Sequence, residues 1–168
     1  QRLPDNYEFK YRRVGSRRVL RTAFFTGLSR LQLSIWAIVV DKQRLTAGVM
    51  SLDRVGFYGW AIGELIATMP AAEIANSIMA IDDPARSTKF AKGLRVHISR
   101  ALRAIGRRSG FKKIVGHDAA REDALQCADM IAGALAEHIS GGDSWAYKQI
   151  AGKFVNVLFR PEKTNLPS

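Results

Sequence analysis

Carboxylates stand at three positions of this chain where they could do chemistry. Asp82 comes directly after the apolar run Ile74–Ile81, and Asp118 closely follows the run Phe111–Gly116. Asp129 lies inside a mostly apolar stretch, although Asp is a poor residue for a helix interior. Magnesium prefers oxygen ligands and usually takes one or two carboxylates, leaving positions for water and substrate phosphate. We therefore expect Asp82 and Asp129 to bind Mg²⁺ or Mn²⁺, as in two-metal phosphodiester hydrolysis.

Each of these residues also has a plainer interpretation. The acidic pair that begins at Asp82, followed by proline, is equally typical of an ordinary turn or helix cap. Asp129 could instead form a surface salt bridge with Arg121 or Lys148. His117, at the end of an apolar run, is more often structural or exposed than a group that orients water or substrate. These alternatives stay open from the sequence alone.

Positive charge is the second feature with chemical meaning. The 168 residues hold 26 Lys and Arg against 15 Asp and Glu, a net charge of +11. Ten of the basic residues lie between Pro84 and His117, where there is no Asp or Glu. At about 100° per residue, one helix face there collects Lys89, Lys92, Arg100, Arg103 and Arg107. Such a face favours contact with nucleic acid, RNA or DNA, over a merely solvated surface, which would usually mix both signs.

Hydrophobic periodicity predicts the elements that must position these residues. Helices are expected over Arg17–Leu28, from about Asp53 to Thr68, over Arg86–Ile105 and over Glu122–His138, and a short one after Ser144. Strands are expected over Leu31–Val40, Ile74–Ile81, Phe111–Gly116 and Phe154–Phe159. Strands that alternate with helices of this length predict an α/β fold, with helices packed on a largely parallel sheet. In such sheets, ligands gather outside the carboxyl ends of the strands.

The same periodicity predicts which side chains the two strongest helices bury. For the helix that begins near Arg86, the expected stripe is Phe90, Leu94, Ile98, Ala101, Leu102 and Ile105. For the helix that begins near Glu122, it is Leu125, Ala128, Ile131, Ala132, Leu135 and Ile139. On the second wheel Asp129 lies at the border of the stripe, beside Gln126 and Gly133.

Composition excludes several classes of protein. A chain of 168 residues with 47% hydrophobic residues is expected to form one domain, residues 1–168, with a loose tail over 161–168. No apolar stretch is long enough to span a bilayer. Cys127 is the only cysteine, so we expect it to pack in the core of a cytoplasmic protein. The motifs of dinucleotide-binding folds, P-loops, serine hydrolases and zinc proteases do not occur.

The decapeptide LQCADMIAGA, residues 125–134, resembles the closing LQ-x-AD-x-x-AGA motif of a bacterial and phage family. That family is known as domain of unknown function three thousand eight hundred. Glu8-Phe9-Lys10 resembles its early E-hydrophobic-K element, residues 38–42 (IVVDK) its VVxDK strand end, and Ile81-Asp82-Asp83 its hydrophobic-D-acid strand end. The resemblance covers most of the chain, from about Glu8 to residue 140.

This resemblance implies a ribonuclease-H-like fold, a mixed and mostly parallel sheet flanked by helices, with carboxylate-bound magnesium and nuclease activity. Carried over to this sequence, Asp82 and Asp129 are metal ligands and catalytic acids, and Glu8 is a third catalytic acid. The family opens with a D-E-S-G strand that supplies the first acid. This chain has no such motif, so we expect a domain that is incomplete at its N-terminus.

Three functions are compatible with these patterns. The first is a magnesium-dependent nuclease that holds its substrate on the basic face. The second is a catalytically inactive nucleic-acid-binding or regulatory module of a phage, mobile element or defence system, as the missing first acid suggests. The third is a partner-binding domain of such a system, in which the basic surface serves only solvation.

Overall fold

The computed structural model describes residues 7–14, 17–83, 88–107 and 110–161. By its internal contacts the chain divides into two compact units. The first unit consists of residues 1–35, 81–86 and 117–155, and the second of residues 36–80, 87–116 and 156–168.

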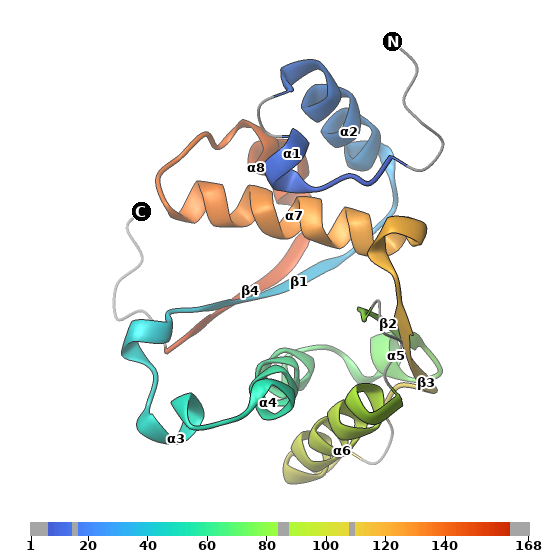
Figure 1. Cartoon of the computed structure of the whole chain (residues 1–168), viewed down its shortest axis with the longest axis vertical. Coiled ribbons are helices and arrows are strands. Elements are labelled where there is room, and N and C mark those ends of the chain that lie inside the picture. Colours follow the sequence, from blue (N-terminus) through green and yellow to red (C-terminus); the bar gives the residue numbers. More distant parts are fainter. Residues whose placement is uncertain (1–6, 15–16, 84–87, 108–109, 162–168) are drawn as a thin grey trace. The chain divides into compact units, whose positions relative to one another are not determined.

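The first unit is built around α7 (Asp123–Ile139), which is flanked by α1 (Tyr11–Val14), α2 (Arg18–Arg30) and α8 (Trp145–Ile150) (Figure 1). Within it, α7 contacts α1 and α8, and α2 contacts α1 and α8. The short helices η2 (Ala119–Arg121) and η3 (Ala151–Lys153) complete this unit. Its core consists of Val14, Phe25, Leu28, Ile35, Met130, Ala134, Ala146 and Ile150.

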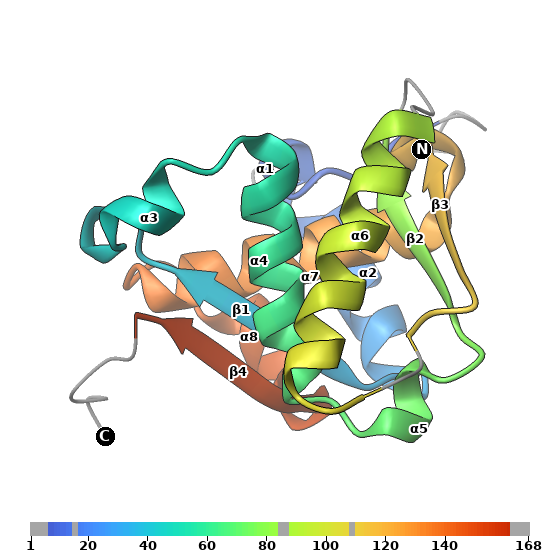
Figure 2. The ribbon, with the colours of Figure 1, turned by 90° about the horizontal axis from the view of Figure 1, so that it is seen from below.

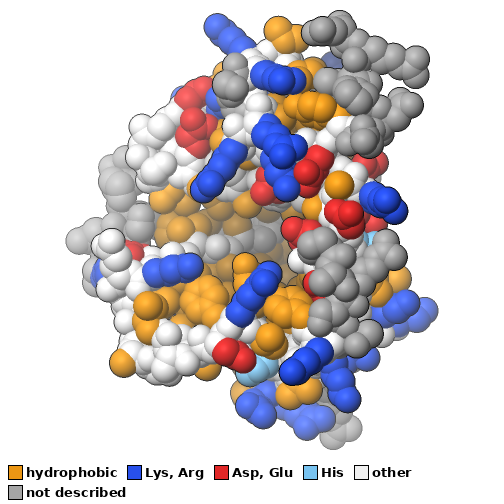
Figure 3. Space-filling model, viewed as in Figure 1, with side chains coloured by type: hydrophobic (Ala, Val, Ile, Leu, Met, Phe, Trp, Pro, Cys, Tyr) orange, Lys and Arg blue, Asp and Glu red, His pale blue; other side chains and the backbone are white. Residues whose placement is uncertain are grey.

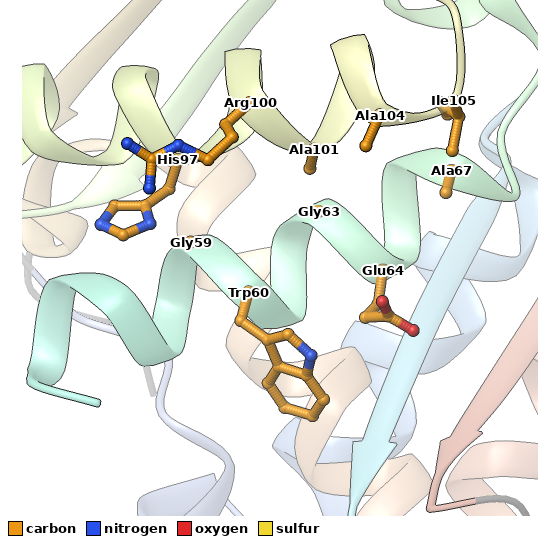
Figure 4. Close-up of a pocket in the computed structure, with 10 residues that line it drawn as sticks. All are labelled: Gly59, Trp60, Gly63, Glu64, Ala67, His97, Arg100, Ala101, Ala104 and Ile105. Atoms are coloured by element: carbon orange, nitrogen blue, oxygen red, sulfur yellow. The ribbon is translucent and has the colours of Figure 1, made fainter. Parts of the chain in front are cut away.

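The second unit contains a close pair of helices, α4 (Arg54–Ala67) and α6 (Thr88–Ala104) (Figure 2). The two helices approach closely because glycines of α4 face side chains of α6. A methyl group on Gly63 would stand 2.7 Å from the Cβ of Ala101, and one on Gly59 would overlap His97. Figure 4 shows both glycines on the side of α4 that faces α6. Three short helices also belong to this unit: η1 (Lys42–Arg44), α3 (Ala47–Met50) and α5 (Ala71–Ile74).

The described strands form two separate two-stranded sheets. One pairs β1 (Ile35–Val40) with β4 (Phe154–Arg160), and their arrows run in the same direction in Figure 2. The other pairs β2 (Ile78–Asp82) with β3 (Lys113–His117). This second pair is parallel, because Lys112 N–H donates to Ser77 O at one end and Asp83 N–H to His117 O at the other. The α/β class is therefore confirmed, but the described strands pair in twos rather than in one sheet.

Most element boundaries agree with the sequence-based expectations within a few residues. Asp53 begins α4 as predicted, because its carboxylate accepts a hydrogen bond from Gly56 N–H at 2.7 Å. The predicted start of α6 at Arg86 and the tail beyond Pro161 lie outside the described residues. Along α6 the stripe is largely right, with Leu94, Ile98 and Leu102 buried.

Of the predicted buried stripe of α7, Leu135 alone is among the buried residues of this helix. The residues that the helix buries are Gln126, Met130, Ala134 and Leu135, whereas Ala128 and Ala132 are exposed. The reason is tertiary, because α1 and α8 cover the face that contains Gln126 and Met130. Periodicity assigns a helix face with a polar side chain to solvent. Such a face can nevertheless be buried when a residue distant in sequence forms a hydrogen bond with that side chain.

None of the helices among the described residues is both long and apolar enough to cross a membrane.

Candidate functional site

Asp82 is the last residue of β2, as the sequence predicts for an acid at a strand end. Its side chain is exposed, and its Oδ1 accepts a hydrogen bond from Ala119 N–H at 3.3 Å. The neighbouring Asp83 N–H continues the ladder to His117 O at 2.9 Å. Asp82 therefore links the end of β2 to the segment that leads into α7, and it presents its carboxylate at the surface of the first unit.

Asp129 lies on the second turn of α7 and is exposed rather than at the border of a buried stripe. Its Oδ2 accepts a hydrogen bond from the backbone N–H of Tyr11, the first residue of α1, at 2.9 Å. Among the described residues it forms no ion pair with Arg121 or Lys148. The carboxylate has a definite structural task, which is to fix the start of α1 against α7.

Glu8 directly precedes this anchored segment. Its side chain is 16% exposed and forms ion pairs with Lys10 Nζ at 2.9 Å and Arg13 Nη1 at 3.9 Å. The next residue is anchored as well, because Phe9 N–H donates to Gln126 Oε1 at 2.8 Å. Glu8 is therefore a largely covered acid whose charge is balanced by neighbours of its own segment.

The decapeptide 125–134 thus has a structural explanation in this fold. Residues 126, 129 and 133 follow one another along a single face of α7, and that face receives the segment around Tyr11. Gly133 is the point of closest approach, because a methyl group there would overlap the ring of Tyr11. One turn further along, Glu137 Oε2 accepts a hydrogen bond from the Tyr11 hydroxyl.

An ion-pair network around the buried Arg21 continues from Glu137, and sequence reasoning missed it. Arg21 of α2 is 8% exposed, donates to Glu137 Oε2 at 3.2 Å and pairs with Asp143 Oδ2 at 3.1 Å. Burial, followed by the hydrogen bond to Glu137, raises the pKa of Tyr11 above its usual value. One signal was present in the sequence, since Arg21 precedes the buried Phe25 and Leu28 by four and seven positions.

The remaining candidates of the first unit have local roles. His117 Nδ1 lies 3.5 Å from Glu122 Oε2, and Asp118 accepts a hydrogen bond from Ala120 N–H at 3.0 Å at the start of η2. Cys127 packs against the core as predicted. Burial, and to a smaller extent Asp123, raises the pKa of its thiol.

The fit of these acids to a divalent cation is limited. No group of three or more His, Cys, Asp or Glu that could hold a metal occurs in the part of the chain that the structure describes. Asp82 and Asp129 each use one carboxylate oxygen for a backbone N–H. One or two carboxylates are within the usual number for Mg²⁺, so the two acids stay candidates, whereas a three-acid centre with Glu8 is not formed by the described side chains.

The basic face predicted on α6 is present at the surface of the second unit. Lys89, Lys92, Arg100 and Arg103 are exposed, and Figure 3 shows Lys and Arg side chains gathered over α6 at the bottom of the view. None of these four forms an ion pair with a described residue. Arg95, which the sequence analysis left out, is a fifth exposed cation of this helix.

Arg107 differs from the other residues of the predicted face. Its guanidinium donates to Ile66 O at 3.0 Å and to Met69 O at 2.6 Å, at the C-terminal end of α4. A cation at this position adds side-chain hydrogen bonds to carbonyls at the end of the helix, and it complements the helix dipole. Arg107 therefore caps α4 in this structure, and the nucleic-acid contact expected of it stays a prediction.

A groove of about 300 Å³ runs along the seam between α4 and α6. Small residues form much of its wall, and His97 and Arg100 lie toward one end of it (Figure 4). Glu64, which also lines the groove, is paired with Arg160 Nε at 2.6 Å. The carboxylate of Glu64 is thus engaged by Arg160. Arg100 belongs both to the basic face and to the lining of the groove, and it adds a positive charge where the two meet.

Comparison of the chain with protein-family models, with curated proteins and with solved structures finds no match.

Proposed function

We propose that this protein binds the phosphate backbone of nucleic acid through the exposed cations of α6. The observation that carries the proposal is the set Lys89, Lys92, Arg100 and Arg103, which are exposed and have no ion-pair partner among the described residues. A surface of this kind gains affinity by releasing the counterions that nucleic acid carries.

The spacing of these cations suits a polyanion. From Lys89 to Arg103 the helix axis rises about 21 Å, at about 1.5 Å per residue. That length corresponds to about six nucleotides of a strand with a rise of about 3.4 Å. A small anionic ligand would need converging cations, whereas these four are distributed along the helix.

Charge segregation argues against solvation as the only role. The sequence of α6 has Lys and Arg but no Asp or Glu, and the sequence of α7 has acids at 123, 129 and 137 but no Lys or Arg. A surface that serves solubility usually intersperses the two signs. Here α6 has five exposed cations and no acid, as expected for an electrostatic binding surface.

Fluorescence anisotropy with labelled oligonucleotides over a series of salt concentrations tests this proposal. The double variant Lys92→Gln/Arg103→Gln is expected to bind more weakly than wild type. Its slope of log K against log salt should be smaller by about 1.4 to 1.8, because two phosphate contacts are lost. The matched control is Arg12→Gln/Lys148→Gln, which removes two exposed cations of the first unit. Equal weakening by both double variants would overturn the assignment to α6.

A second function, metal-dependent hydrolysis of phosphodiesters, is supported by Asp82 and Asp129. Both are exposed carboxylates of the first unit with one oxygen engaged by a backbone N–H. Bound Mg²⁺ or Mn²⁺ would supply an activated water, as the ribonuclease-H-like fold expected from the sequence implies. The test is calorimetric titration with Mn²⁺ together with a cleavage assay, on wild type and Asp82→Asn. Manganese affinity and cleavage that are the same in both would exclude Asp82 from such a centre.

A further inference from the structure

An exposed tyrosine ring packs against a partly buried phenylalanine ring of α6 in the second unit. Tyr58 of α4 is 47% exposed, and its ring meets that of Phe90 of α6 edge to face, with centroids 6.3 Å apart. Large aromatic side chains bury most of their area when they serve only to fill a core, as Phe25 does at 0% exposure. The exposure of Tyr58 therefore calls for a different explanation.

Arg54 adds a positive charge to this pair of rings. Its guanidinium carbon lies 5.9 Å from the centroid of the Tyr58 ring and 5.5 Å from that of Phe90. Arg54 is exposed and has no ion pair with any residue that the structure describes. The acid next to it in sequence, Asp53, is engaged with Gly56 N–H. The guanidinium thus lies near two rings, with no countercharge among the residues that the structure describes.

The platform formed by Tyr58, Phe90 and Arg54 lies near the N-terminal end of α6, where Lys89 and Lys92 begin the row of exposed cations. Aromatic rings and arginine planes beside a row of cations are the means by which proteins hold unpaired bases. The rings stack with the bases while the cations follow the phosphates. A duplex keeps its bases stacked on one another and cannot offer them to such a platform.

We propose that the nucleic acid bound by α6 is single-stranded, and that one of its bases stacks on the platform formed by Tyr58, Phe90 and Arg54. This inference rests on the proposed function and adds to it the class of substrate. The phosphates next to the stacked base would lie on Lys89 and Lys92.

Two single-stranded oligonucleotides of the same length and charge test the inference, one with all its bases and one abasic throughout. Wild type is expected to bind the first oligonucleotide at least about fivefold more tightly, because each base that stacks on an aromatic ring adds to the affinity. In Tyr58→Leu this preference should largely disappear, whereas Tyr58→Phe should keep it. The far-ultraviolet circular dichroism of both variants serves as the control for folding.

The remaining outcomes separate the two proposals. If wild type binds both oligonucleotides equally, or if Tyr58→Leu keeps the preference, the stacking platform is wrong. Binding that still weakens in Lys92→Gln/Arg103→Gln would then leave the proposed function standing. If wild type binds neither oligonucleotide and no duplex, the proposed function fails and this inference fails with it. An oligonucleotide with one 2-aminopurine base gives a second measure, because stacking on Tyr58 should quench its fluorescence in wild type and not in Tyr58→Leu.

Discussion

The carboxylate of Asp129 accepts a hydrogen bond at 2.9 Å from the backbone N–H of Tyr11, a residue 118 positions earlier in the chain. The bond ties the first turn of α1 to the middle of the first unit. It also gives the most distinctive acid of the sequence a role that needs no metal. As a hydrogen-bond acceptor Asp129 needs only an oxygen atom, whereas as a metal ligand it needs its negative charge. Substitutions can separate these two roles.

We expect Asp129→Asn to keep the stability of the fold and Asp129→Ala to lower it by about 1 kcal/mol, because only Asn retains an oxygen that can accept the Tyr11 N–H. Urea unfolding of the two variants beside wild type measures this. A metal ligand would behave differently, since Asn would then abolish Mn²⁺ binding as completely as Ala does. Equal losses of stability in both variants would show that the charge, and not the hydrogen bond, holds α1.

Gly133→Ala tests the close approach of α1 and α7. Alanine is normally the better residue in a helix interior, but here its methyl group would overlap the ring of Tyr11. We expect a net loss of about 1–3 kcal/mol, as for an overpacked contact. In the background Tyr11→Ala the loss should become small or change sign. A loss that is independent of the residue at position 11 would contradict this explanation.

Much of the fold could be predicted from the sequence because its elements have clear local signals. Asp53 begins a helix by capping Gly56 N–H, and Leu94 and Ile98 are buried on the predicted face of α6. The prediction failed where burial depends on a partner distant in sequence. In α2 the apolar Val19 is 82% exposed, whereas the charged Arg21 is 8% exposed. Arg21 is buried because Glu137 and Asp143 neutralise it, and no local pattern reveals such partners.

The candidate site was predictable in part for the same reason. The cations of α6 follow from helical periodicity alone, so Lys92 and Arg103 lie at the surface as expected. Periodicity also placed Arg107 among them, and only the tertiary structure shows that it caps α4. The platform around Tyr58 escaped notice because an aromatic residue in an apolar helix is usually assigned to the core.

The raised pKa of Tyr11 predicts how stability depends on pH. Burial and the hydrogen bond to Glu137 favour the protonated phenol in the folded state, while the unfolded chain ionises near the ordinary value of about 10. The resulting stabilisation is fully present below pH 10 and is lost as the pH rises above it. Thermal unfolding between pH 8 and pH 11 should therefore show a steeper fall in Tm for wild type than for Tyr11→Phe. Parallel curves would indicate that Tyr11 ionises equally in both states.

Two glycines inside helices are expected to respond in opposite directions to replacement by alanine, because only one of them lies at the contact between α4 and α6. Gly63→Ala would bring a methyl group to 2.7 Å from the Cβ of Ala101, and we expect a loss of about 1–3 kcal/mol. Gly27, inside α2, has nothing within 4 Å of such a methyl group. Gly27→Ala should therefore stabilise by about 0.5–1 kcal/mol through helix propensity. Denaturant unfolding of both variants measures the difference, and a neutral Gly63→Ala would show that the helices can separate without cost.

We expect substitutions of two arginines near the C-terminal end of α6 to have different effects. One should lower the stability of the fold, and the other should weaken binding. Arg107→Gln removes the guanidinium that donates to Ile66 O and Met69 O, and we expect a loss of about 1–3 kcal/mol, as for hydrogen bonds from a charged group. Arg103→Gln removes an exposed cation with no described ion-pair partner. Its stability should change by less than about 0.5 kcal/mol, as at most surface positions.

The two variants should rank in the reverse order in binding. Arg103→Gln is expected to weaken oligonucleotide binding and to reduce the salt slope by about 0.7 to 0.9, the value for one phosphate contact. Arg107→Gln, measured well below its unfolding temperature, should keep the slope of wild type because its guanidinium faces the carbonyls of α4 and not the solvent side of α6. If Arg107→Gln instead reduced the slope as much as Arg103→Gln, the capping contact would not be its main role. The cation would then belong to the binding face.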